Sequence, residues 1–242
     1  MNEHLVAVCT SAVMFVATLC RSTFGFGDAL IAMPLLTLLL GVRTASPVVA
    51  LTGVLIAILV ALDARAHVDW RAARDLLIAA AVGVPLGAIA VKVLPESAIS
   101  EGLGVLLISY AIYAAFPGSG PRLESKHWAW PFGVVSGWLA GAINASGPPV
   151  VIFAALRHWD PQRTRATLQA FFLPLSAFVA VAHGATGLWT KQVAVLSATS
   201  IPALVAAAYL GRVLNRMVPP DKFTRIIQII LAGPGLLLLL TS

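Results

Sequence analysis

Apolar runs of about 20 residues recur along this chain, and they restrict its fold more than any other feature. A helix needs about 20 apolar residues to cross roughly 30 Å of hydrocarbon. Eight runs approach or reach that length, near residues 5–22, 47–63, 74–93, 98–116, 128–143, 166–183, 192–211 and 223–240. Only 11% of the 242 residues are charged, against about 25% in soluble proteins. The sequence therefore predicts an all-α polytopic membrane protein with about eight transmembrane helices and no separate soluble domain.

Two shorter apolar segments, 28–41 and 147–157, follow polar interruptions of the helical pattern. At 1.5 Å per residue each would be only about 15–20 Å long, too short to span comfortably. The interruptions read 23-TFGFGDALIAMP-34 and 141-GAINASGPPVV-151. Glycine permits sharp turns, and proline starts a helix well. Both segments are predicted to be half-helices that begin at a break.

The order of these elements repeats after 120 residues. This shift aligns Gly27 with Gly147, Arg43 with Arg163, and Thr44 with Thr164. Each half then contains a span, a glycine break, a half-helix, an Arg-Thr loop and three spans. We expect two inverted four-helix repeats, residues 1–120 and 121–242, within one membrane domain.

The net charge of +6 is interpreted as a topology signal rather than as a sign of nucleic-acid binding, because basic residues fall in short loops. If each broken segment is a hairpin, 13 of the 16 Lys and Arg share one face, with Arg21 at the first hairpin tip. Arg43, Lys92 and Lys191 lie on the other face. By the positive-inside rule, both termini are then predicted to be outside.

The two breaks also suggest a chemistry. A helix N-terminus presents unpaired N–H groups and about half a positive charge, so two such ends would form an anion site without a buried Lys or Arg. The alternative is that the glycines only allow close helix packing. Asp28 is either the N-cap of its half-helix or a group that carries a coupling proton or cation. The candidate substrate-binding residues are Thr23, Gly25, Gly27, Asp28, Asn144, Ser146, Gly147, Pro148 and Arg165.

Several other residues have simpler interpretations. Arg165 is expected at the inner end of its helix, where it could guide an anion. His183 ends a span and is expected to be interfacial rather than a proton relay. Asp160 and Pro161 form a cap and first-position pair for the next helix. Cys9 and Cys20 lie in an apolar run, and no Cys/His spacing indicates a metal, so neither a metal nor a cofactor is expected.

The motifs 25-GFGDALIAMPLL-36, 137-GWLAGAINASGPPVVIFAA-155 and 164-TRATLQAFF-172 resemble those of the TauE/SafE family, also called the sulfite exporter family. Members often have further glycines at the position of Asp28. The resemblance implies export of small sulfur-containing anions, such as sulfite, sulfonates or sulfoacetate, across the bacterial inner membrane. The expected partners are a small anion and the lipid bilayer, and a homodimer is left open.

Three other functions fit parts of the sequence. An anion channel can also be built from inverted repeats, and ohmic currents would distinguish it from a carrier with saturable flux. An intramembrane serine hydrolase would use Ser146 as nucleophile and His183 as base, and a fluorophosphonate probe would then label Ser146. A purely structural membrane subunit would not need two polar breaks at matching positions.

Overall fold

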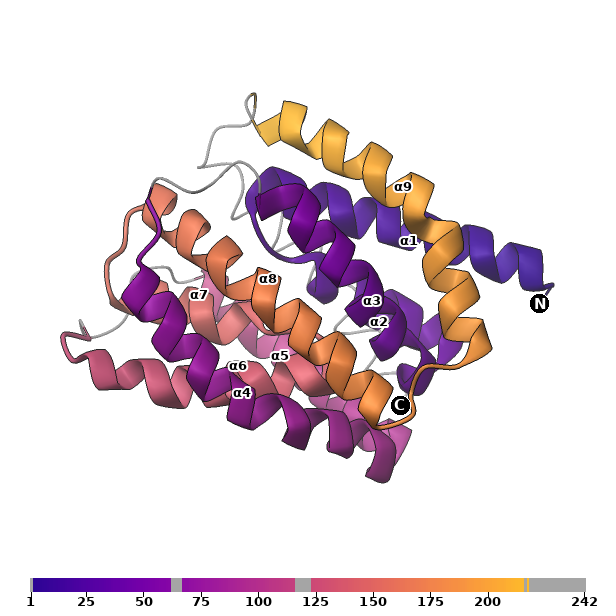
Figure 1. Ribbon diagram of the computed structural model, residues 1–242, viewed down its shortest axis with the longest axis horizontal. Coiled ribbons are helices and arrows are strands. Elements are labelled where there is room, and N and C mark those ends of the chain that lie inside the picture. The colour runs from indigo at the N-terminus through magenta and orange to yellow at the C-terminus, as the bar shows by residue number, and fades with distance from the viewer. Residues whose placement is uncertain (1, 62–66, 116–122, 216, 218–242) are drawn as a thin grey trace.

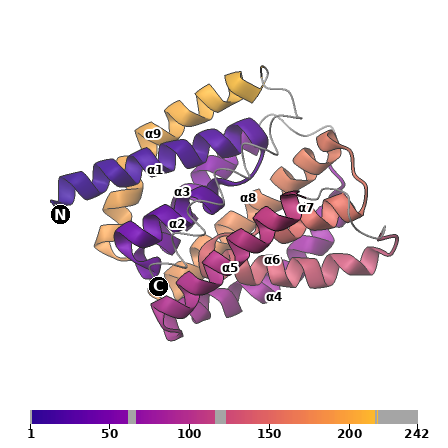
Figure 2. The ribbon, with the colours of Figure 1, turned by 180° about the vertical axis from the view of Figure 1, so that it is seen from behind.

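The computed structural model describes residues 2–61, 67–115, 123–215 and 217, and every regular element in these ranges is a helix, as predicted (Figures 1 and 2). The helices are α1 Glu3–Phe24, α2 Asp28–Leu40, α3 Val42–Ala61, α4 Trp70–Val93, α5 Glu96–Ala115, η1 Lys126–Trp128, α6 Ala129–Ile143, α7 Gly147–Leu156, α8 Pro161–Ala185 and α9 Lys191–Asn215. Seven of the eight predicted spans coincide with a helix. The eighth, 223–240, lies outside the described residues.

Five of the described helices are long and apolar enough to cross a membrane: α1, α3, α4, α8 and α9. The two predicted half-helices are also present, as α2 and α7, with 13 and 10 residues. At 1.5 Å rise per residue these are about 20 and 15 Å long. The protein is therefore a multi-pass membrane protein that combines full-length helices with short apolar ones.

Helices α4 and α6 pack with their backbones in direct contact. Gly133, Gly137 and Gly141 recur every fourth residue along one face of α6, and α4 contributes Gly83 and Gly87. A Cβ built on Gly137 would lie 2.1 Å from the Ala80 carbonyl oxygen, and one built on Gly141 would lie 2.1 Å from that of Val84. Small residues at this spacing let membrane helices approach closely. This packing holds α6, and with it the second break, against the rest of the bundle.

The chain reverses direction at both breaks, so that α1 with α2 and α6 with α7 form helical hairpins (Figures 1 and 2). Basic side chains gather at one end of the bundle, where Arg71, Arg74, Lys126 and Arg157 line one pocket. At the opposite end Arg43 donates to the carbonyl of Lys92. The described loop residues thus follow the charge separation that the hairpin arrangement predicts.

Candidate functional site

The first break is a reversal between α1 and α2 built on two glycines. Gly25 and Gly27 have φ of 96° and 100°, in the left-handed region that side chains disfavour. The Gly25 N–H donates to the Arg21 carbonyl and ends α1. Gly27 is the N-cap of α2 and Asp28 is the first helical residue, so of the two roles expected for Asp28 the N-cap role is wrong. Its side chain bonds to Arg21 instead.

The second break is held by side chains from α3 and from α6 itself. Asn144 ends α6 with φ of 56°, and its amide nitrogen donates to the carbonyl oxygen of Ser46 at 2.8 Å and to its hydroxyl at 3.1 Å. The Ser46 hydroxyl in turn donates to the Ala142 carbonyl at 2.9 Å. Ser136 donates to the Ser146 carbonyl at 2.7 Å. These bonds satisfy irregular backbone that would otherwise be costly inside a membrane protein.

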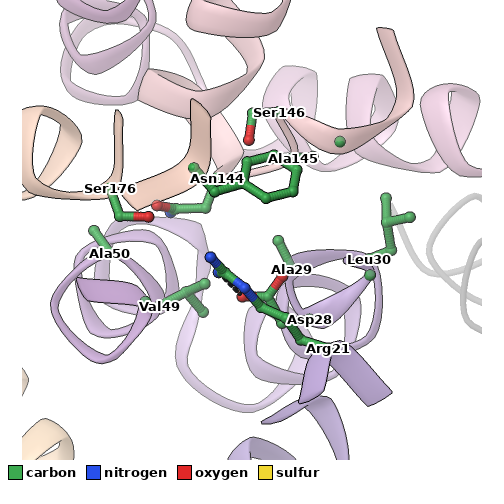
Figure 3. Close-up of a pocket in the computed structure, with 14 residues that line it drawn as sticks. Arg21, Asp28, Ala29, Leu30, Val49, Ala50, Asn144, Ala145, Ser146 and Ser176 are labelled. Carbon is green, nitrogen blue, oxygen red and sulfur yellow. Dashed lines mark hydrogen bonds and ion pairs between the residues drawn. The ribbon is translucent and has the colours of Figure 1, made fainter. Parts of the chain in front are cut away.

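The two breaks meet at one small pocket, with a volume of about 40 Å³ for the centres of water-sized molecules. Gly27 and Gly147 both line it, and a Cβ built on Gly147 would touch the Phe26 ring at 3.5 Å. Figure 3 shows the pocket between the α6–α7 break, the start of α2 and side chains from α3 and α8. Its lining residues come from α1, α2, α3, the second break, α7 and α8: Arg21, Gly27, Asp28, Ala29, Leu30, Val49, Ala50, Gly53, Asn144, Ala145, Ser146, Gly147, Phe172 and Ser176.

Arg21 lies in the last turn of α1, at the tip of the first hairpin as predicted, and its side chain is buried against this pocket. Only 4% of the residue is exposed. Its Nη1 donates to Asp28 Oδ2 at 2.7 Å, and its guanidinium lies over the Phe172 ring, 5.2 Å from the centroid. Nε and Nη2 are buried without a hydrogen-bond partner. The expectation of a site without a buried Lys or Arg is therefore wrong.

Five of the nine predicted site residues line the pocket: Gly27, Asp28, Asn144, Ser146 and Gly147. The side chain of Ser146 makes no capping hydrogen bond to α7. The other four, Thr23, Gly25, Pro148 and Arg165, are not among the lining residues. The Thr23 hydroxyl donates to the Leu19 carbonyl of its own helix at 2.7 Å, so it does not present a donor to the pocket.

Arg165 and Gln169 of α8 hydrogen-bond to the backbone of the first break. Arg165 donates to the Ser22 carbonyl at 3.3 Å, and its Cγ would lie 3.1 Å from a Cβ on Gly25. The Gln169 amide donates to the Gly25 carbonyl. Arg165 therefore packs against the α1–α2 turn. Arg165 does not stand free at the inner mouth of a transport path, where it was expected to guide an anion.

His183 lies in the last turn of α8, at the end of a span as predicted, and it is fully buried within the protein. Its Nε2 lies 2.7 Å from the Gly141 carbonyl oxygen in the α4–α6 packing region. A histidine that bonds a backbone carbonyl in this way fixes helix position. In this structure its Nε2 is engaged by Gly141 and does not act on Ser146.

The sequence carries a signal for a functional role of Arg21. A charged residue within a membrane span is itself a functional indication, and Arg21 lies inside the apolar run 5–22. Asp28 follows seven residues later, a distance of about two helical turns. Reading the two as a pair required knowing that the chain reverses between them.

The loop ends carry carboxylates that are held ionised. Asp69 caps α4; burial alone would raise its pKa, but the Ala72 N–H and Arg163 outweigh burial and hold that pKa below its usual value. The Arg163 N–H likewise lowers the pKa of Asp160, which caps α8 as predicted. Within the described ranges, no group of three or more His, Cys, Asp or Glu side chains could hold a metal ion.

Comparison with known proteins adds one match. The family model described as "Sulfite exporter TauE/SafE" matches residues 10–238, nearly the whole chain. No curated protein and no solved structure matches the chain.

Proposed function

Because this chain belongs to the TauE/SafE family of sulfite exporters, we propose that it is a secondary transporter for a small sulfur-containing anion. Sulfite, a sulfonate or sulfoacetate would be exported across the bacterial inner membrane. The observation that carries the proposal is that two helix breaks, 120 residues apart in sequence, line one pocket together with a buried arginine.

The start of α2 supplies most of the backbone donors. Ile31 N–H is the first to bond within the helix, to the Gly27 carbonyl at 3.3 Å. The N–H groups of Asp28, Ala29 and Leu30 precede it and have no acceptor in their own helix. All three residues line the pocket. An anion there gains from these donors and from the positive end of the helix dipole.

The start of α7 contributes fewer N–H donors than the start of α2. It presents the same positive end of a helix dipole. Pro148 and Pro149 have no N–H, so Gly147 supplies the N–H of the first turn. Pro148 therefore shapes the helix start rather than binding through its backbone nitrogen. Ser146 stands beside it with a side chain that makes no capping bond, and we assign its hydroxyl as a donor to the anion.

Alternating access would follow from two inverted repeats, 1–120 and 121–242, that move about this pocket. The proposal is supported by the matching order of a broken hairpin followed by long helices in each half. It includes eight spans, with 223–240 as the last, and both termini outside. A homodimer is compatible with this arrangement and is not needed to complete the site.

Flux in proteoliposomes tests the function. The full-length protein is reconstituted and loaded with labelled sulfite, sulfate, methanesulfonate or a carboxylate, with and without a pH gradient. We expect saturable flux of sulfite or the sulfonate, and a change in rate when the gradient is applied if a proton is coupled. Empty liposomes and the Gly147→Val variant serve as controls.

Two outcomes would contradict the transporter. Ohmic single-channel currents in a planar bilayer, without saturation, would identify a channel. Labelling of Ser146 by a fluorophosphonate, lost in Ser146→Ala, would identify a serine hydrolase. Absence of flux for every tested anion would contradict the proposed substrate class.

A further inference from the structure

The guanidinium of Arg21 has one paired end and one buried edge without a hydrogen-bond partner. Nη1 donates to Asp28, while Nε and Nη2 have no hydrogen-bond partner, although the side chain is only 5% exposed. Buried charged donors are normally paired, because an unpaired one loses its hydrogen bonds to water and gains none in the protein. Two unpaired donors on one buried arginine, beside a pocket, therefore point to a missing acceptor.

The geometry of the unpaired edge restricts the kind of acceptor that can bind there. The Nε–H and one Nη2–H of a guanidinium are parallel and form a fork that matches two oxygens bound to the same atom. Carboxylates, sulfonates and sulfite present such a pair, whereas a halide presents a single centre. The Phe172 ring lies over the guanidinium and Asp28 holds Nη1, which leaves the Nε–Nη2 edge for a ligand.

We propose that Arg21 is the residue that determines specificity in the central site, and that its Nε–Nη2 edge binds two oxygens of the substrate oxyanion. Asp28 is a positioning residue: it fixes the guanidinium through Nη1 and takes no part in ligand contact. This assignment rests on the proposed transport function for its substrate, but the binding geometry can be measured separately.

Asp28 also explains how Arg21 is tolerated in the empty site. The ion pair compensates both charges, so neither is buried alone. When an oxyanion binds, the site gains one negative charge. The starts of α2 and α7, which both line the pocket, offset that charge through their dipoles. Binding thus does not require the Arg21–Asp28 pair to break.

The test compares two probes on purified full-length protein. The rise in unfolding temperature is titrated with methanesulfonate and with bromide, which gives an affinity for each. We expect the unmodified protein to prefer methanesulfonate. In Arg21→Lys the charge remains but the fork is lost, so the preference should fall by about tenfold. Arg43→Lys, an exposed arginine at the end of the bundle, is the matched control and should leave the preference unchanged.

Asp28 is tested by rescue. Asp28→Ala frees the guanidinium and removes a negative charge, so bromide affinity should hold or rise while the preference for methanesulfonate falls. Asp28→Asn keeps an oxygen that can accept from Nη1 and should restore most of the preference. A merely structural role for Asp28 would lower both affinities together, and that result would contradict its positioning role.

A charge-neutral variant guards against loss of folding. Arg21→Gln combined with Asp28→Asn replaces the ion pair by a neutral polar pair, and it should lose methanesulfonate binding. Unchanged binding in this variant, or an unchanged preference in Arg21→Lys, would overturn the inference. If the preference follows the variants but the unmodified protein shows no flux, the transport function fails and the binding geometry stands. If flux is present and Arg21→Lys keeps the preference, only the inference fails.

Discussion

The Nη1 atom of Arg21 donates to Oδ2 of Asp28 over 2.7 Å, and this bond bridges the turn between α1 and α2. It joins the last turn of one helix to the first residue of the next across two left-handed glycines. The pair fixes the orientation of the only described break that contains charged side chains. It also places a guanidinium at the pocket shared with the second break.

Gly147→Val should reduce transport at least about tenfold while the protein still inserts. Gly147 is helical and precedes Pro148, a position where a β-branched side chain clashes with the proline ring. Its γ carbons would also press on Phe26 and Phe172, which lie 3.5 and 3.9 Å from a Cβ. Gly147→Ala makes only ordinary contacts and should keep most activity. The measurement is proteoliposome flux normalised to reconstituted protein, and equal flux in both variants would count against a site at this break.

Gly137→Ala should destabilise the protein by about 1–3 kcal/mol or more, the usual cost of overpacking. The added Cβ would lie 2.1 Å from the Ala80 carbonyl oxygen, so α4 and α6 must separate. Gly102→Ala is the control, because a Cβ there meets nothing within 4 Å and helix propensity favours alanine. Unfolding temperature in detergent reports the difference, and equal values would contradict the close α4–α6 packing.

Ser46→Ala should cost about 1–3 kcal/mol, because the buried hydroxyl links α3 to the C-terminal end of α6, where the second break begins. It donates to Ala142 and accepts from Asn144. Thr52→Val, on the same helix, is the control: the Thr52 hydroxyl returns to the Val48 carbonyl of its own helix at 2.7 Å. We expect lower stability and lower flux for Ser46→Ala alone. A similar loss in both variants would show that the effect comes from α3 in general.

Asp69→Asn should remove a pH-dependent contribution to stability. The pKa of Asp69 is held below its usual value in the folded protein. The ionised carboxylate therefore stabilises the folded protein at pH values above the pKa of the unfolded chain, which is about 4. That contribution is lost as the pH falls through the lower folded pKa. At pH 7 the free energy of unfolding of the parent should exceed that of Asp69→Asn by about 0.5–1 kcal/mol. The difference is small because Arg163 is partly exposed and water screens the pair.

The difference in free energy of unfolding between the parent and Asp69→Asn should disappear below about pH 4. Asp75→Asn is the control, because Asp75 pairs with the exposed Arg74 beside it. Its stability should stay close to that of the parent across the range. A gap for Asp69→Asn that persists at low pH would refute the pairing as its source.

Cysteine labelling should reveal both hairpins. In a background with Cys9→Ala and Cys20→Ala, single cysteines replace the exposed residues Asn2, Lys126 and Lys191. An impermeant maleimide applied from outside intact cells should label Asn2→Cys and Lys191→Cys, while Lys126→Cys should react only after permeabilisation. Labelling of Lys126→Cys in intact cells would reverse the proposed orientation.

The sequence by itself determined the class of fold and the two breaks. Hydrophobic length and local backbone preference are encoded within short stretches, so α2, α7 and the turns at Gly27 and Gly147 could be located to within a residue or two. Five pocket residues could be named for the same reason, because they lie at or beside the two breaks that glycine and asparagine create.

Only the tertiary structure decided the partners of the polar side chains. Whether Arg21 faces water or Asp28, and whether the Asn144 amide bonds to Ser46, depends on helices that meet after the chain reverses. The same holds for His183, which bonds Gly141 because α8 and α6 lie side by side at that depth. A charged residue in an apolar run has the same neighbours in sequence whether it faces water or a buried partner. Its environment is set by long-range packing, which the local sequence does not encode.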